Sequence, residues 1–105
     1  GKLLVLGWGS TYGAIRTAVK RKQDEGRLVS HVHLRFLNPL PEDLGSILQN
    51  FEKILVPELN LGQLIRIIRD EYLISAIGFS KVRAQPFDCG DIERAIEDAL
   101  QGKQP

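Results

Sequence analysis

Residues 2–19 read KLLVLGWGSTYGAIRTAV, a short aliphatic run that passes through a glycine-rich segment into a helical pattern. The uninterrupted aliphatic residues predict a parallel strand over Lys2–Leu6 that is covered on both faces. Beyond the glycines, Ile15, Ala18 and Val19 recur at helical spacing. A strand, a glycine loop and a helix in this order mark the carboxyl edge of an α/β sheet, where such folds bind ligands and partners.

The same alternation of strand and helix occurs four times along the chain. Further strands are predicted over Leu28–Phe36, Lys53–Glu58 and Ile77–Val82, with helical patterns between and after them. Four such units predict a three-layer α/β/α domain with a mainly parallel sheet of about four strands and right-handed crossovers. With flavodoxin-like winding the strand order is 2-1-3-4. The Gly7–Gly13 loop and the Glu58–Asn60 loop then face each other across the switch point.

Two of the predicted helices carry signals at their start. Pro41 suits the first position of the second helix, with Glu42 and Asp43 in its first turn. Asn60, with Gln63 three residues later, predicts a capping pair at the start of the third helix.

Composition limits the classes of function. The chain has 105 residues, with 14 basic and 13 acidic side chains and a net charge of +1. This balance does not predict a nucleic-acid or anionic-membrane partner, and no apolar run is long enough to cross a bilayer. A single cysteine excludes an internal disulfide and suits a reducing compartment. We therefore expect one cytoplasmic domain over residues 1–105, a fragment of a longer subunit because it starts on a strand without a leader.

The glycine segment GWGSTYG fits no complete cofactor motif. Its spacing, G-x-G-x-x-x-G, differs from the dinucleotide fingerprint, and no acidic residue ends the second strand to hold a ribose. It also lacks the lysine followed by serine or threonine of a P-loop. Two interpretations remain. Ser10 or Thr11 caps the helix, which the spacing favours, or the helix N-terminus and these hydroxyls hold a phosphate or carboxylate.

Aromatic and histidine side chains provide further candidates. Trp8 and Tyr12 place two large aromatics on one loop, which predicts contact with another domain or chain. His31 and His33 point to the same face of a strand and could be two ligands of a metal site. Because no third ligand lies nearby in the sequence, partly buried, hydrogen-bonded histidines are the favoured interpretation.

Cys89 opens the last helix, whose apolar positions run from Ile92 to Leu100. It would be a nucleophile only with a histidine within reach, so a small residue in the capping region is favoured. Four basic residues of the first helix have acidic neighbours, which predicts a solvated helix face. They are Arg16, Lys20, Arg21 and Lys22.

Four segments together resemble one enzyme family. They are GWGSTYG (7–13), LRFLNPLP (34–41), VPELNLGQL (56–64) and KVRAQPF (81–87). In this order they are similar to the C-terminal domain of the alpha subunit of 2-oxoglutarate:ferredoxin oxidoreductase, also called 2-oxoglutarate synthase. The resemblance runs from residue 3 to about residue 100. It implies a fold like the transketolase C-terminal domain.

The resemblance also implies a function for the whole enzyme. Such an enzyme oxidatively decarboxylates a 2-oxoacid, here 2-oxoglutarate, to the acyl-CoA with thiamine diphosphate and Mg, coenzyme A, ferredoxin and an iron–sulfur cluster. That chemistry is housed in other domains or the beta subunit, so no catalytic residue, cofactor or metal is expected in this domain. Its implied partners are the thiamine-binding domain of the same subunit and the beta subunit, and the excised domain could form a homodimer.

We therefore expect a domain that packs and assembles the enzyme through the carboxyl edge of its sheet. The candidate interface or anion-binding residues are Trp8, Gly9, Ser10, Thr11, Tyr12, Glu58, Asn60 and Gln63. The alternative is a module that binds a small anion or effector in the crevice between the Ser10 loop and Asn60.

Overall fold

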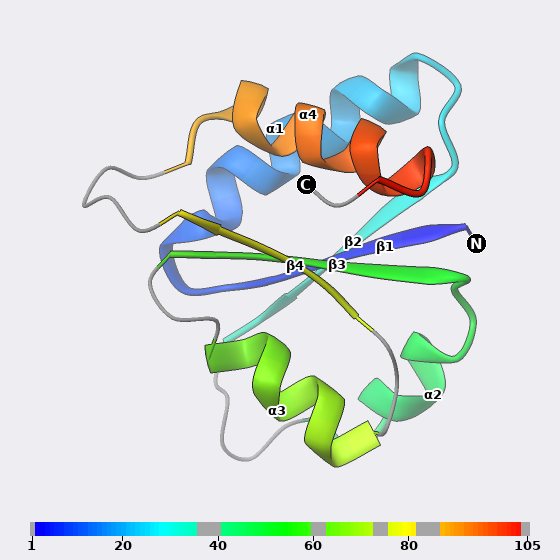
Figure 1. Ribbon diagram of the computed structural model, residues 1–105, viewed down its shortest axis with the longest axis vertical. Coiled ribbons are helices and arrows are strands. Elements are labelled where there is room, and N and C mark those ends of the chain that lie inside the picture. The colour runs from blue at the N-terminus through cyan, green and yellow to red at the C-terminus, as the bar shows by residue number, and fades with distance from the viewer. Residues whose placement is uncertain (1, 36–40, 60–62, 73–75, 82–86, 104–105) are drawn as a thin grey trace.

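The computed structural model describes residues 2–35, 41–59, 63–72, 76–81 and 87–103. A four-stranded parallel sheet lies between two layers of helices (Figure 1). The strands are β1 (Leu3–Trp8), β2 (Val29–Leu34), β3 (Lys53–Leu59) and β4 (Ile77–Lys81). Their order in the sheet is β2-β1-β3-β4, so the predicted three-layer fold and strand order are confirmed.

Of the helices in the described ranges, two cover each face of the sheet. Figure 1 shows α1 (Tyr12–Asp24) and α4 (Cys89–Leu100) on one side, and α2 (Leu44–Leu48) and α3 (Gln63–Tyr72) on the other. A 3-10 turn over Gly9–Thr11 joins β1 to α1. None of the helices in the described ranges combines the length and the apolar character that a bilayer crossing requires.

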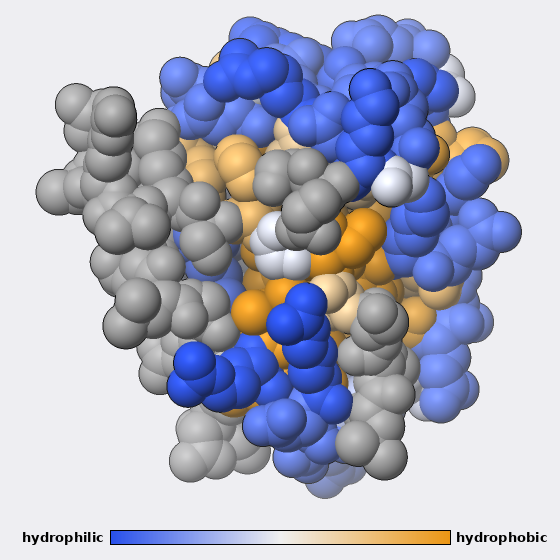
Figure 2. All heavy atoms as spheres, viewed as in Figure 1, coloured by the Kyte–Doolittle hydropathy of each residue, from blue (hydrophilic) through white to orange (hydrophobic). Residues whose placement is uncertain are grey.

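Each face has its own buried core, because successive side chains of a strand point to opposite sides. Leu3 and Val5 of β1 pack with the residues of α1 and α4, whereas Leu4 and Leu6 pack with those of α2 and α3. The largest fully buried partners are Ile15, Ile92 and Ile96 on the first side and Leu44, Leu64 and Ile68 on the second. In Figure 2 apolar side chains form a band between two hydrophilic helical layers.

The first strand is longer than predicted. It continues past Leu6 through Gly7 and ends at Trp8. At Gly7 a Cβ atom would lie 2.5 Å from Ile15 Cδ1 and 3.3 Å from His33 Nδ1, so a side chain there would require the Ile15 side chain of α1 to shift. Gly9 has φ +67°, in the left-handed region that suits glycine, and it turns the chain toward α1. The glycine segment therefore serves close packing and a sharp turn.

The second helix starts later than predicted. The α2 helix begins at Leu44, and Asp43 stands at its N-cap position without a side-chain capping bond. The Leu44 backbone N–H donates to the Pro41 carbonyl at 3.2 Å. Pro41 thus opens a turn before the helix, and the prediction that it begins the helix itself is wrong.

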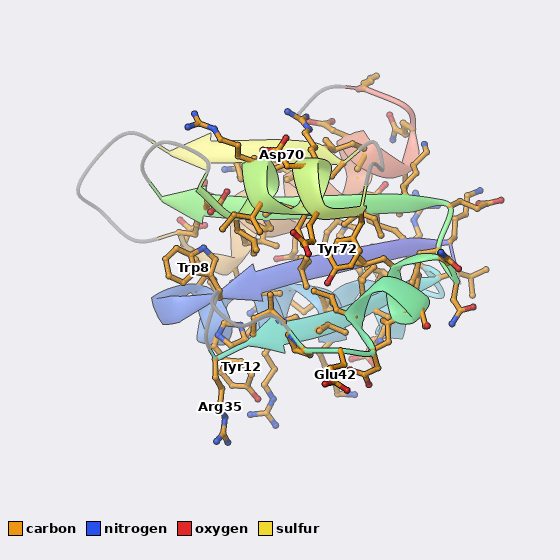
Figure 3. The ribbon with its side chains drawn as sticks, turned by 90° about the horizontal axis from the view of Figure 1, so that it is seen from below. Trp8, Tyr12, Arg35, Glu42, Asp70 and Tyr72 are labelled. Carbon is orange, nitrogen blue, oxygen red and sulfur yellow. The ribbon has the colours of Figure 1, made fainter. Side chains whose placement is uncertain are left out.

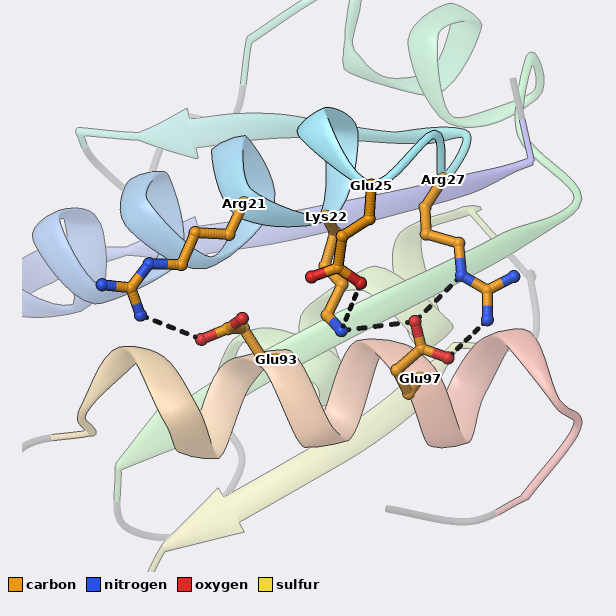
Figure 4. A network of polar contacts seen from close by, with 6 residues as sticks. All are labelled: Arg21, Lys22, Glu25, Arg27, Glu93 and Glu97. Atoms are coloured by element: carbon orange, nitrogen blue, oxygen red, sulfur yellow. Dashed lines mark hydrogen bonds and ion pairs between the residues drawn. The ribbon is translucent and has the colours of Figure 1, made fainter.

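The prediction of a solvated basic face on α1 is wrong at Lys22. Its side chain is buried, and its ammonium lies 3.3 Å from a carboxylate oxygen of Glu25 and 3.3 Å from one of Glu97 on α4 (Figure 4). Arg27 donates to both oxygens of Glu97, at 2.9 and 2.6 Å. These hydrogen bonds, that of Arg27 first, lower the pKa of Glu97. Charges on α1 and α4 therefore neutralise one another across the helix interface.

We predict that Glu97→Gln lowers the free energy of unfolding by about 1–2 kcal/mol, because it leaves the buried Lys22 ammonium with less compensation. Asp24→Asn is the matched control, since it breaks an exposed pair with Lys20 and should change stability by less than about 0.5 kcal/mol. Urea unfolding near pH 7 measures both variants. Equal losses in the two variants would show that the interhelical network does not stabilise the packing.

Candidate functional site

The switch point of the sheet lies between β1 and β3. The β1 strand pairs with β2 up to Trp8 and Leu34, but its register with β3 stops at Val5 and Leu55. The two central strands therefore separate over their last residues. In open α/β sheets this gap is where ligands bind.

The carboxylate of Glu58 lies at the β3 side of this gap. Although it is acidic, Glu58 is only 2% exposed. One carboxylate oxygen accepts a hydrogen bond from the Leu64 backbone N–H at 2.5 Å, and the other accepts one from the Ile65 N–H at 3.1 Å. These N–H groups belong to the first turn of α3 and have no partner within the helix. Glu58 therefore satisfies the start of α3 and lies at the positive end of its dipole.

Trp8 closes the gap from the β1 side. Its indole Nε1 donates to Glu58 Oε1 at 3.0 Å, across 50 residues of sequence. Continuing the register from Val5 and Leu55 places Trp8 opposite Glu58, so this bond joins the strands where their backbone pairing has ended. The Trp8 ring also packs against the core of the α2 and α3 side. Figure 3 shows it at the strand ends.

These contacts leave little for an external anion to bind at α3. The Leu64 and Ile65 N–H groups already donate to Glu58, whose buried carboxylate would repel a second negative group. At the start of α1, the Thr11 hydroxyl donates to the Trp8 carbonyl at 2.9 Å. Of the two predicted caps, Ser10 or Thr11, Thr11 does not serve, because its side chain makes no cap bond to α1. The Ser10 side chain is not among the described groups.

The capping pair predicted from Asn60 and Gln63 falls on groups that the structure does not describe, namely Asn60 and the Gln63 side chain. The capping bonds described at α3 come from Glu58 instead. A reciprocal capping box is present at α4. There Asp88 accepts from the Asp91 N–H at 2.8 Å, and Asp91 accepts from the Asp88 N–H at 3.3 Å.

Tyr12, His31 and His33 form a cluster beside the edge strand β2. Tyr12 is 47% exposed, and its ring centroid lies 5.8 Å from that of His31 and 5.0 Å from that of His33. His33 Nε2 is 3.1 Å from the Gly9 carbonyl oxygen. The buried ring nitrogens His31 Nε2 and His33 Nδ1 have no hydrogen-bond partner in the described part of the chain. The predicted hydrogen bonding of the histidines is thus seen at His33.

The histidine pair does not form a metal site with other described residues, since no group of three or more His, Cys, Asp or Glu side chains comes together there. Burial, with a smaller effect of His33, lowers the pKa of His31 to about 4. His31 is therefore neutral near pH 7.

Cys89 is the first residue of α4, and its thiol accepts a hydrogen bond from Arg21 Nη1 at 3.0 Å. Arg21 also donates to Glu93 at 3.2 Å. The described partner of Cys89 is thus an arginine rather than a histidine. Its position agrees with the favoured interpretation of a small residue in the capping region.

The structure brings several of the predicted site residues together and reassigns their roles. Trp8, Gly9, Thr11, Tyr12 and Glu58 all lie at the carboxyl edge of the sheet. Sequence reasoning missed that Glu58 faces inward as the cap of α3. The signal for it is an acidic residue directly after the apolar run at residues 54–57, six residues before the first N–H that it caps.

Comparisons with known proteins agree on one family. The profile of the pyruvate:ferredoxin oxidoreductase core domain II matches residues 1–86. The 2-oxoglutarate oxidoreductase subunit KorA of Mycobacterium tuberculosis is 44% identical over 102 residues, which are 97% of this chain and 16% of that protein. The 2-oxoacid:ferredoxin oxidoreductase 1 subunit alpha of Aeropyrum pernix is 32% identical over 74 residues, covering 67% of this chain and 12% of its own length.

A solved structure shares the fold. It is the 2-oxoglutarate:ferredoxin oxidoreductase from Magnetococcus marinus, with 2-oxoglutarate, coenzyme A and succinyl-CoA bound. The TM-score is 0.90 at 31% identity, and the match covers 96% of this chain and 18% of that chain. This chain therefore spans less than a fifth of the length of each relative.

We predict that Glu58→Ala lowers the free energy of unfolding by about 3 kcal/mol, because two backbone N–H groups and the Trp8 indole lose their acceptor. Glu58→Gln retains one amide oxygen and should lose about half as much. The exposed Glu52→Gln is the control and should be near neutral. Urea unfolding tests the series, and a neutral Glu58→Ala would contradict the capping role.

We also predict that His31 contributes to acid instability. Between about pH 6.5 and 4 the unfolded chain binds a proton at this residue and the folded chain does not, so stability falls as the pH falls through this window. His31→Gln should flatten that part of the profile of unfolding midpoint against pH. Carboxylates contribute equally to both proteins, so parallel profiles would mean that His31 titrates normally in the fold.

Proposed function

The chain belongs to the pyruvate:ferredoxin oxidoreductase core domain II family, and on that basis we propose that it is part of a 2-oxoglutarate:ferredoxin oxidoreductase. In this proposal it is the C-terminal domain of the alpha subunit, one domain over residues 1–105 of a longer cytoplasmic protein. Support comes from the 44% identity to a 2-oxoglutarate oxidoreductase subunit and from the fold shared with a 2-oxoglutarate:ferredoxin oxidoreductase. The whole complex would oxidatively decarboxylate 2-oxoglutarate to the acyl-CoA.

Within that complex the domain acts in packing and assembly rather than in catalysis. One observation carries this role: the switch point, where open α/β folds bind ligands, is spanned by the hydrogen bond between the Glu58 carboxylate and the Trp8 indole of the chain itself. An edge closed in this way offers a shaped surface to another domain. Its partners in this proposal are the thiamine-binding domain of the same subunit and the beta subunit.

The cofactors of the complex do not fit the residues of this chain. An iron–sulfur cluster takes several cysteine thiolates, and the sequence has one cysteine. A thiamine diphosphate would bring its negative charges to a gap that holds the buried Glu58 carboxylate. We therefore assign thiamine diphosphate with Mg and the iron–sulfur cluster to other domains or the beta subunit, with coenzyme A and ferredoxin as partners of the whole enzyme.

The proposed contact surface lies around Tyr12. Glu58 is buried and Trp8 is half-buried, so they shape the edge from within, whereas Tyr12 presents an exposed aromatic ring. Aromatic side chains that combine apolar area with a polar tip are typical anchors of protein interfaces. Asn60 remains a candidate at the same edge on the evidence of sequence.

We predict that Tyr12→Ala in the full alpha subunit raises the dissociation constant of the complex with the beta subunit by about tenfold, because an interface anchor is lost. Leu28→Ala is the control, since Leu28 is 70% exposed but lies at the other end of β2. Analytical ultracentrifugation measures the association. An unchanged association of the Tyr12 variant, or turnover of 2-oxoglutarate by the present chain alone, would refute the assembly role.

A further inference from the structure

Four side chains define what we call the β2 surface: Tyr12, Arg16, His33 and Arg35. Tyr12 lies over His33, with ring centroids 5.0 Å apart. Arg35 follows β2 directly and is exposed. Figure 3 shows Tyr12 and Arg35 extending on the same side of the molecule, away from the labelled Trp8. An aromatic ring and a guanidinium therefore meet solvent together at this edge of the sheet.

Arg16 extends the β2 surface along α1. The side of α1 that faces β2 is fixed at both ends, because Tyr12 packs on His31 and His33 and Gln23 Nε2 donates to the Val29 carbonyl at 2.8 Å. Arg16 stands four residues after Tyr12 and is exposed, so it lies one turn further along the same side.

The charges of Arg16 and Arg35 are not neutralised by other described groups. Within the described ranges neither arginine forms an ion pair or a side-chain hydrogen bond, whereas the other basic residues of α1 do. Those pairs are Lys20 with Asp24, Arg21 with Glu93, and Lys22 with Glu25 and Glu97. In a chain of net charge +1, the β2 surface is thus a local positive region beside an exposed tyrosine.

We propose that the β2 surface binds an acidic segment of a partner polypeptide in the assembled enzyme. Carboxylates of that segment pair with Arg16 and Arg35, and an apolar part of it packs on the Tyr12 ring. Arginine presents a planar fork of donors that fits a carboxylate, and tyrosine and arginine are among the residues enriched at interface hot spots. This inference rests on the assembly role proposed above and adds the charge of the partner.

Two further features favour a polypeptide over a small anion. Among the described strands, β2 pairs with β1 alone, so its outer edge offers backbone groups to an extended segment. Tyr12, Arg16 and Arg35 are also all exposed, whereas small-molecule sites are concave and bury most of the ligand surface. Charge complementarity at such a surface chiefly sets partner choice and association rate, and it weakens with salt.

The test uses the full alpha subunit and its beta subunit, with association measured at several salt concentrations between about 50 and about 500 mM NaCl. The double variant Arg16→Glu/Arg35→Glu should raise the dissociation constant at least about tenfold at low salt and flatten its salt dependence. Arg16→Lys/Arg35→Lys keeps the charge and should retain most of the affinity. Arg66→Glu on α3 is the matched control, because it reverses an exposed arginine in the opposite helical layer.

Association unchanged by the double reversal, or changed equally by Arg66→Glu, would overturn the inference. If Tyr12→Ala weakens association while the arginine reversal does not, the assembly role is supported and the proposal of an acidic partner segment is refuted. If neither variant changes association, both the assembly role and the acidic partner segment are refuted. Binding of inorganic phosphate that the double reversal abolishes, without any effect on subunit association, would also overturn it in favour of a small anion. Unchanged thermal unfolding of the variants confirms that the fold is intact.

Discussion

The buried Glu58 carboxylate is the interaction on which the carboxyl edge of this sheet depends. It lies at the end of β3, bonds the first N–H groups of α3 and accepts the Trp8 indole at the end of β1. Three segments that are separated in sequence are thus held at one point. A buried carboxylate is stable in a folded protein only when its oxygens have such partners, so the two central strands, the helix start and the indole constrain one another.

Most of the layered fold could be predicted from the sequence, because it depends on local periodicity. The aliphatic run in β1 and the spacing of Ile92, Ala95 and Ile96 in α4 mark buried faces by themselves. The groups that cap the helix starts were harder to predict from the sequence. Glu58 bonds groups six and seven residues away and an indole 50 residues away, and only the packed sheet brings these together. The sequence therefore indicated the edge as the site but not that its acid faces inward.

The sequence likewise does not show which charged side chains of α1 are paired in the fold. Four basic residues of α1 look alike in the sequence, yet Lys22 is buried between carboxylates and Arg21 bonds Glu93 and Cys89. Only the packing of α4 against α1 distinguishes them from Arg16, which has no such partner in the described ranges. Folding thus neutralises one side of the helix and leaves the side toward β2 positive. The proposed assembly role would use this difference, because internal pairs stabilise the fold and unpaired charges select partners.

The central claim is that the switch point of this domain is spanned by contacts between its own side chains. Amide chemical shifts of Leu64 and Ile65 report on it directly, since both N–H groups donate to Glu58. We predict that neither shift changes when phosphate, 2-oxoglutarate or coenzyme A is added up to about 10 mM, a concentration at which even weak sites fill. Saturable shifts at these two amides would mean that an external anion displaces Glu58, and would contradict the account.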